Sequence, residues 1–371
     1  MFGWRFLRRA RGRAALGLVA AALSVASGMA SAATLPDLLE LPAAQHPRAM
    51  QSVQLAIARA GGKRLVSVGE RGIVLLSDDD GGTWRQAKSV PVSVALTNVA
   101  FVSDVTGWAT GHGGVVLRSD DGGDTWKLQL NGTQAAQLVL EEAKNDMPAS
   151  ENAPNYADSS RALRNAEGLV QDGPDKPFLA LTFADDKHGW VVGAYGLALE
   201  TEDGGAHWHS IVGRIPNPGA RHLYAIRADA GHLLLAGEQG LVIRSDDGGA
   251  SFSTVKTPYE GTFFGILPGT AGPLAFGLRG NAWEQDAQGA WSQVPLPRQI
   301  SLTAALRRAN GDWVLADEAG NLYVRRASEQ AFSPLQLQAP TGLTGVVESA
   351  DGQLVVSSSR GPLRLANGGA Q

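Results

Sequence analysis

The chain has 371 residues, 46 of them glycine, with 18% charged residues, a formal net charge of −4 and no cysteine. The absence of cysteine excludes disulfide bonds, thiolate metal sites and lipid attachment through a cysteine. Abundant glycine beside short apolar runs is typical of short strands joined by tight turns, so we expect an all-β protein.

Residues 1–32 have the pattern of a secretory signal peptide. Five arginines precede an Ala/Leu/Val run over residues 14–26, and Ala30-Ser31-Ala32 supplies the small residues that signal peptidase accepts. We expect cleavage after Ala32 and a periplasmic mature chain of residues 33–371; a retained membrane anchor is the alternative for this segment. Its removal takes away five arginines and no acidic residue, which lowers the formal charge from −4 to −9. This charge disfavours nucleic acid as a partner, and no later segment is apolar enough to span a bilayer.

A repeat of strand, turn, strand, turn and strand then recurs along the chain. Each strong copy begins with G-x-x-G and ends in a turn of the form S/T-x-D-x-G-x-x-aromatic. In this turn we expect the aspartate to accept backbone N–H groups, the glycine to adopt a conformation that other residues resist, and the aromatic ring to pack inward. The structural residues of the four strong copies are Asp79 and Trp84, Asp121 and Trp126, Asp203 and Trp208, and Asp247 and Phe252.

Three weaker copies follow, and the seven copies begin at residues 69, 111, 193, 237, 277, 317 and 358. The spacing is about 41 residues apart from one doubled gap, and four-stranded units of this length predict a seven-bladed β-propeller. Because the last copy stops after three strands, we expect Asp37–Leu41 to supply the missing strand and close the ring. Eight blades is the alternative if the long gap contains a degenerate copy.

The long gap instead carries helical periodicity over residues 131–177. Apolar residues recur at helical spacing in two runs, which are Ala135, Leu138, Val139 and Ala143, and then Ala162, Leu163, Ala166, Leu169 and Val170 before Gly173. The pattern predicts a helical hairpin inserted between blades two and three. Links between blades leave a sheet at the same end as the second-to-third-strand turns, so we expect the insertion on the face that carries the G-x-x-G turns, here called the funnel face.

The funnel face is where we expect a ligand or partner, because loops on a rigid scaffold commonly carry function. The candidate binding residues in its turns are Arg71, His112, Tyr195, Glu238, Gln239, Arg279, Glu318 and Arg360. We expect no catalytic residue, no metal and no cofactor.

The S/T-x-D-x-G turn matches the Asp-box, or bacterial neuraminidase repeat. Within that group, the runs Gly193-Ala-Tyr-Gly196 and Thr201-Glu-Asp-Gly-Gly205 resemble bacterial relatives of the photosystem II assembly and stability factor. The stretch Asp172-Gly-Pro-Asp-Lys-Pro-Phe178 and the helical insertion resemble an exported proteobacterial branch that tends to be encoded beside RND-type transporters. The resemblance implies a non-enzymatic assembly or accessory factor for an envelope complex, with a membrane transporter as partner.

Two other classes of function remain as alternatives. Sialidases also carry Asp-boxes, and Arg214-Ile215-Pro216, Tyr259-Glu260 and Arg279 offer residue types that such a glycosidase uses, although the triplet follows the third Asp-box instead of preceding the first. The other alternative is a module that binds a glycan or small ligand through the funnel. His207 and His209 would share a strand face as in a metal site, but His207 occupies the threonine position of the Asp-box turn.

Overall fold

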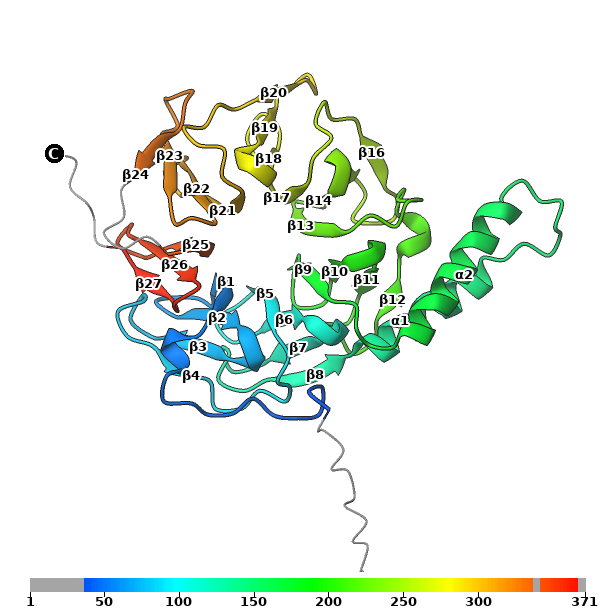
Figure 1. Cartoon of the computed structure of the whole chain (residues 1–371), viewed down its shortest axis with the longest axis horizontal. Helices are drawn as coiled ribbons and strands as arrows, with labels where there is room; N and C mark the ends of the chain where they lie inside the picture. The colour runs from blue at the N-terminus through cyan, green and yellow to red at the C-terminus, as the bar shows by residue number, and fades with distance from the viewer. Residues whose placement is uncertain (1–36, 336–340, 366–371) are drawn as a thin grey trace, which may run out of the picture. The chain divides into compact units, whose positions relative to one another are not determined.

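A computed structural model describes residues 37–335 and 341–365. The expected signal peptide lies outside these ranges. In the described part, 27 strands form seven antiparallel sheets, six of four strands and one of three, in which each strand pairs with its neighbours in sequence. The first strands of successive sheets contact one another from β1 to β25, and β25 contacts β1, so the seven sheets form a closed ring (Figure 1).

The strand bounds follow the repeat. The first three sheets contain β1 (Gln54–Arg59), β2 (Leu65–Gly69), β3 (Val74–Ser77) and β4 (Arg85–Gln86); β5 (Leu96–Phe101), β6 (Gly107–Gly111), β7 (Val116–Ser119) and β8 (Lys127–Leu130); and β9 (Phe178–Phe183), β10 (Gly189–Gly193), β11 (Ala198–Thr201) and β12 (His209–Ser210). The next two contain β13 (Leu223–Asp229), β14 (His232–Gly237), β15 (Val242–Ser245) and β16 (Ser253–Val255); and β17 (Phe263–Leu267), β18 (Leu274–Gly277), β19 (Ala282–Gln285) and β20 (Trp291–Gln293). The last two contain β21 (Leu302–Arg307), β22 (Trp313–Asp317), β23 (Leu322–Arg325) and β24 (Ser333–Leu335); and β25 (Leu343–Glu348), β26 (Leu354–Ser358) and β27 (Leu363–Arg364).

The hydrophobic core lies between neighbouring sheets. Every residue of the second strands β2, β6 and β10 is buried, because both faces of each sheet are covered by adjacent sheets. One apolar cluster, for example, joins Val66 and Leu76 of the first sheet to Val99, Leu117 and Trp126 of the second. The outer strands are short and more exposed, which explains why the apolar runs in the sequence coincide with the inner strands.

The Asp-box turns join the third and fourth strands of four sheets and satisfy their own polar groups. Ser77 Oγ donates to Asp79 Oδ1 at 2.8 Å and accepts the Gly81 N–H at 2.7 Å, while the Asp79 carboxylate accepts the Thr83 N–H at 2.8 Å. Gly81 has φ +90°, and a Cβ there would lie 2.9 Å from Val355 Cγ1, so glycine is required. The same bonds recur around Asp121, Asp203 and Asp247.

The prediction that an N-terminal strand completes the seventh sheet is wrong. Asp37–Leu41 forms a turn, in which the Leu39 N–H donates to Asp37 Oδ1 at 2.9 Å and the Glu40 N–H to the Asp37 carbonyl at 3.0 Å. An aspartate that accepts a backbone N–H two residues ahead favours a turn over an extended strand. Within the described residues the seventh sheet keeps three strands.

Side-chain hydrogen bonds join the first and seventh sheets. The buried Asp80 carboxylate accepts from Arg59 at 2.8 Å and from the Ala350 N–H at 3.0 Å. Arg59 also donates to the Glu348 carbonyl at 2.6 Å, and Thr344 Oγ1 donates to the Gln54 carbonyl at 2.7 Å. These bonds cross between the two ends of the repeat array, so they close the ring.

Two helices lie in the chain between β8 and β9: α1 (Gly132–Asn145) and α2 (Tyr156–Asp172). Asn131 and Gln134 form a capping box at the start of α1, and α2 ends at Gly173 with φ +79°. Ala135, Val139 and Ala143 bury one face of α1 in an apolar cluster that includes residues of the second and third sheets. Helix α1 is therefore part of the core, and α2 packs against it. No helix in the described ranges is long and apolar enough to cross a membrane.

Substituting Asp80 tests the ring closure. Asp80→Asn removes one acceptor and the charge, and asparagine tolerates the left-handed backbone at this position (φ 62°). We expect the free energy of unfolding in urea to fall by about 2 kcal/mol, because a buried donor on Arg59 or Ala350 loses its partner. The control Asp78→Asn, at an exposed ion pair in the same turn, should cost less than about 1 kcal/mol. Equal losses would contradict the closure role.

The lowered pKa values of the Asp-box carboxylates lead us to expect that the stability of the fold falls in acid. Hydrogen bonds from the Ser251 hydroxyl and N–H lower the pKa of Asp247 from 3.8 to about 2. A lowered pKa in the folded state stabilises the fold above pH 3.8, and this contribution is lost as the pH falls toward about 2. Asp247→Asn keeps an acceptor but does not titrate, so the difference in urea midpoint between wild type and variant should shrink from pH 6 to about pH 2. A difference that does not change with pH would refute this.

Candidate functional site

Four of the seven turns between second and third strands place a non-glycine side chain in left-handed backbone. Five of them are single 3-10 turns: η2 (Glu70–Gly72), η3 (His112–Gly114), η4 (Ala194–Gly196), η6 (Glu238–Gly240) and η7 (Leu278–Gly280). Their central residues have positive φ, which is 54° at Arg71, 55° at Tyr195, 54° at Gln239 and 57° at Arg279, with glycine (φ 69°) only at Gly113. All four non-glycine residues are exposed or half-buried.

The exception in η3 has a steric cause. A Cβ at Gly113 would lie 2.5 Å from Leu39 Cδ2, because the N-terminal segment covers this turn. The other four turns carry large side chains at a backbone conformation that costs about 1 kcal/mol or more for a non-glycine residue. The same conformation recurs in five sheets, so it belongs to the repeat, and it holds the four side chains at the surface.

The eight predicted binding residues all lie in second-to-third-strand turns and are exposed or half-buried. The structure brings three of them together, which are Tyr195, Glu238 and Gln239, through two residues that the sequence analysis missed. His222 Nδ1 accepts the Tyr195 N–H at 3.0 Å, and the His222 N–H donates to Glu238 Oε2 at 2.8 Å. Arg221 Nε donates to Gln239 Oε1 at 2.9 Å. No described contact joins Arg71, His112, Arg279, Glu318 or Arg360 to this group.

Aromatic rings extend this group along the inner strands. The rings of Tyr195 and His222 lie 4.9 Å apart, those of His222 and Tyr224 6.2 Å, and those of Tyr224 and Phe264 5.3 Å. Lys176 Nζ lies 5.0 Å from the Tyr195 ring centre. Burial and the Glu238 charge raise the pKa of Tyr224. The sequence could have indicated Arg221 and His222 by their position, because both lie in a link between blades on the funnel face.

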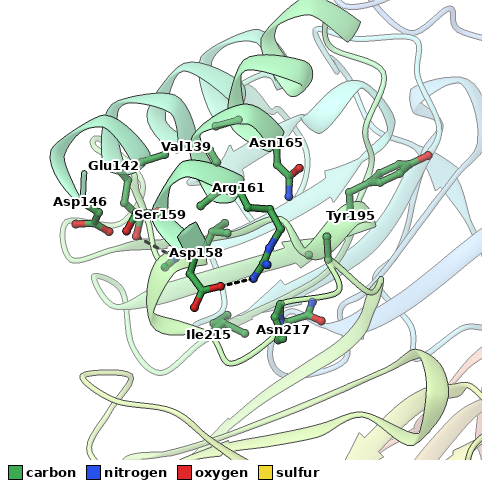
Figure 2. Close-up of a pocket in the computed structure, with 18 of the residues that line it drawn as sticks. Val139, Glu142, Asp146, Asp158, Ser159, Arg161, Asn165, Tyr195, Ile215 and Asn217 are labelled. Carbon is green, nitrogen blue, oxygen red and sulfur yellow. Dashed lines mark hydrogen bonds and ion pairs between the residues drawn. The ribbon is translucent and has the colours of Figure 1, made fainter. Parts of the chain in front are cut away.

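A groove of about 520 Å³ lies between the two helices, turn η4 and residues 212–220 (Figure 2). Apolar side chains from both sides line it, including Val139, Ala143 and Leu169 from the helices and Ile215 and Pro218 from the third-sheet side. The polar lining consists of Asn155 and of the residues labelled in Figure 2, which are Glu142, Asp146, Asp158, Ser159, Arg161, Asn165, Tyr195 and Asn217. Because Tyr195 lines the groove and also contacts His222, the two features are continuous.

The groove is acidic. Burial raises the pKa of Glu142, and its hydrogen bonds from Ser210 and from the Gly213 N–H at 3.2 Å oppose that rise. The nearby Asp146 charge adds to the rise. Asp158 pairs with Arg161 at 2.8 Å, which neutralises the one arginine of the lining. Asp146 has no ion-pair partner among the described residues and therefore gives the groove an excess of negative charge.

The residues that resembled a sialidase site have structural partners. Arg214 binds Glu200 and donates to the Gly249 carbonyl at 2.8 Å, so it links the third sheet to the fourth Asp-box. The Tyr259 hydroxyl donates to the Leu278 carbonyl at 3.2 Å, and burial raises its pKa against the opposing charge of Arg279. A tyrosine nucleophile needs the opposite environment, in which a neighbouring base activates the hydroxyl.

His207 occupies the threonine position of its Asp-box turn and makes the equivalent hydrogen bond. Its Nδ1 lies 2.6 Å from Asp203 Oδ2, which matches the 2.8 Å bond from Thr83 Oγ1 to Asp79 Oδ2. Among the described residues, no group of three His, Asp or Glu side chains is arranged to hold a metal ion.

Comparison with known proteins agrees with this architecture. Residues 167–267, which span η4 and the third and fourth Asp-boxes, match the sequence-family model of the photosynthesis system II assembly factor YCF48. The fold is that of a BNR-repeat β-propeller, the fold that YCF48 also has. No curated protein sequence matches the chain.

Solved structures resemble this YCF48-like propeller at low sequence identity. YCF48 bound to a D1 peptide is 14% identical with a TM-score of 0.61, covering 87% of this chain and 96% of that one. YCF48 from Cyanidioschyzon merolae is 17% identical with a TM-score of 0.60, covering 88% and 99%. Streptogramin B lyase is 13% identical with a TM-score of 0.64, covering 85% and 94%. The same fold therefore serves binding and catalysis, and the site must decide between them.

Substitution of two left-handed turn residues tests whether backbone strain lowers the stability of the fold. Arg71→Gly and Arg279→Gly should each raise the free energy of unfolding by about 1 kcal/mol, because glycine relieves the strained backbone. The matched controls Arg71→Ala and Arg279→Ala remove the same side chains but keep a Cβ in left-handed backbone, so they should give no gain in urea denaturation. A similar result for alanine and glycine would show that strain is not stored there.

Proposed function

We propose that this protein is a non-enzymatic periplasmic factor that assembles or assists an envelope complex, an RND-type transporter, by binding a polypeptide segment of it. The groove between the helical hairpin and turn η4 carries the proposal. It supports binding of a chain segment because two helices and a loop line it with both apolar and polar side chains.

The proposed docking surface includes both the groove and the funnel-face turns. Contacts of α1 with η3 and η5 (Val212–Arg214), and the shared residue Tyr195, support placing the hairpin beside these turns. Long insertions in repeat folds are commonly functional. The hairpin thus forms one wall of the binding surface, and the G-x-x-G turns extend it.

The chemistry of the groove selects the segment. Its apolar lining favours aliphatic or aromatic side chains, and the negative charge of Asp146 favours lysine or arginine beside them. A segment from an assembling membrane complex that combines apolar and basic residues fits both. Its affinity should fall as salt concentration rises, because exposed charge pairs are screened.

Two further observations support the class of function. One solved YCF48 holds a D1 peptide, so a propeller of this fold binds a protein segment. The polar groups of Arg214 and Tyr259 are engaged structurally, which disfavours a glycosidase. The transporter partner and the periplasmic location rest on the resemblance and on the signal-peptide pattern of residues 1–32.

Site-specific photocrosslinking in cells tests the proposal. A photoreactive amino acid replaces Tyr195, which is 53% exposed in the groove, or Val105, which is 51% exposed in the β5–β6 turn at the opposite end of the sheets. We expect crosslinks to an inner-membrane transporter from position 195 and none from position 105, identified by mass spectrometry of periplasm-facing envelope fractions. Equal products from both positions, or a cytoplasmic location, would refute it.

Charge reversal tests the groove itself. Asp146→Lys inverts the charge of the lining at the exposed end of α1, and Glu167→Lys makes the same change on exposed α2 surface outside the groove. Crosslinking from position 195 should fall about tenfold in Asp146→Lys, since like charges are placed together, and stay unchanged in Glu167→Lys. Equal yields in the two variants would place the binding surface elsewhere.

A further inference from the structure

A second cavity, of about 220 Å³, lies between the fourth and fifth sheets. Its lining includes Arg227 of β13, His232 at the start of β14 and the β17–β18 turn from Pro268 to Pro273. The β13–β14 and β17–β18 turns leave their sheets at the same end as the Asp-box turns. This cavity is therefore separate from the groove, and a ligand bound in it would be independent of the proposed docking function.

Arg227 is a departure from the repeat. It pairs with Leu234 in the β13–β14 ladder, and the residues at the same ladder position of the other six sheets are uncharged. These residues are Ala58, Ala100, Thr182, Leu267, Leu306 and Val347. The six other sheets show that the fold does not require a charge here, so packing alone does not account for the arginine.

The guanidinium of Arg227 lacks a compensating anion among the described residues. Its Nη1 donates to the Ile226 carbonyl at 3.0 Å, and no carboxylate lies within ion-pair distance in that part of the chain. Arg325 of the sixth sheet shows the usual alternative, because it pairs with Glu284 across a sheet junction at 2.8 Å. Burial lowers the pKa of Arg227, yet an arginine keeps its charge in a protein. Arg227 is half-buried, so its charge is partly removed from water without a compensating partner, and a bound anion would offset that loss.

The rest of the lining limits the kind of anion. Arg244 and His232 at the rim are both engaged by Asp246, at a separation of 2.8 Å for the histidine, so Arg227 is the available cation. Asp229 also lines the cavity and disfavours doubly charged anions. Apolar walls complete it, formed by Leu234, Val242, Val255, Pro268, Ala271 and Pro273.

We propose that this cavity binds a small organic monocarboxylate. The carboxylate would accept two hydrogen bonds from the planar Arg227 guanidinium, and its short apolar body would lie against the valine and proline side chains. Such a site would add a small-ligand function to the Asp-box end of the propeller.

Thermal unfolding and titration calorimetry of the full chain test the proposal, with sodium acetate, butyrate and hexanoate as probes. Sodium chloride at equal ionic strength and n-butanol are the controls for salt and for the apolar body alone. The key variant is Arg227→Leu, since leucine is the residue that the fifth and sixth sheets carry at this position. Arg227→Lys keeps the charge but loses the bidentate geometry.

Arg227→Leu should weaken the stabilisation by carboxylate but raise the melting temperature when no carboxylate is present. Butyrate or hexanoate should raise the melting temperature of the wild type more than chloride or butanol does, and affinity should fall about tenfold or more in Arg227→Leu, with Arg227→Lys between the two. Without carboxylate, Arg227→Leu should melt higher than the wild type, because a half-buried charge without a partner is gone. Equal carboxylate responses in wild type and Arg227→Leu, or no response of the wild type to any of the three acids, would overturn the proposal.

Discussion

Burial of both faces of every sheet is the constraint on which the rest of this structure depends. The second strands β2, β6 and β10 are buried along their whole length, so a single sheet would expose an apolar surface on each side. Only a closed ring covers all seven sheets at once. Closure here is made by the side chains of Arg59, Asp80 and Thr344, which bond across the junction of the first and last sheets. Strand exchange with Asp37–Leu41 takes no part in it.

The two ends of the sheets carry different kinds of turn. At one end the Asp-box turns satisfy their own backbone and hydroxyl hydrogen bonds. At the other end the turns hold arginine, tyrosine and glutamine in left-handed backbone and in open positions. The helical hairpin adds a wall beside these turns, and the result is a groove with apolar lining and negative charge.

Departures from the repeat carry the chemical information in this chain, because the other copies act as internal references. Gly113 departs from its equivalents because Leu39 covers it, which is a structural cause. Arg227 departs from six uncharged equivalents with no packing cause, which is why it points to a ligand. His207 replaces threonine and still bonds to the aspartate of its turn, so this departure has a structural explanation.

The sequence by itself determined the seven repeats, the Asp-box bonds and the approximate bounds of both helices, because each depends on residues close together in the chain and on periodicity. It also placed the eight candidate residues in the correct turns. Only the tertiary structure decided which of them meet: Tyr195, Glu238 and Gln239 come together through Arg221 and His222, and the groove forms between segments far apart in sequence. The sequence pattern also could not predict the turn at Asp37–Leu41. A run of five residues with several apolar members fits a strand or a turn, and only the hydrogen bonds of the structure distinguish the two. Local spacing encodes the blades, whereas contacts between blades depend on how the ring closes.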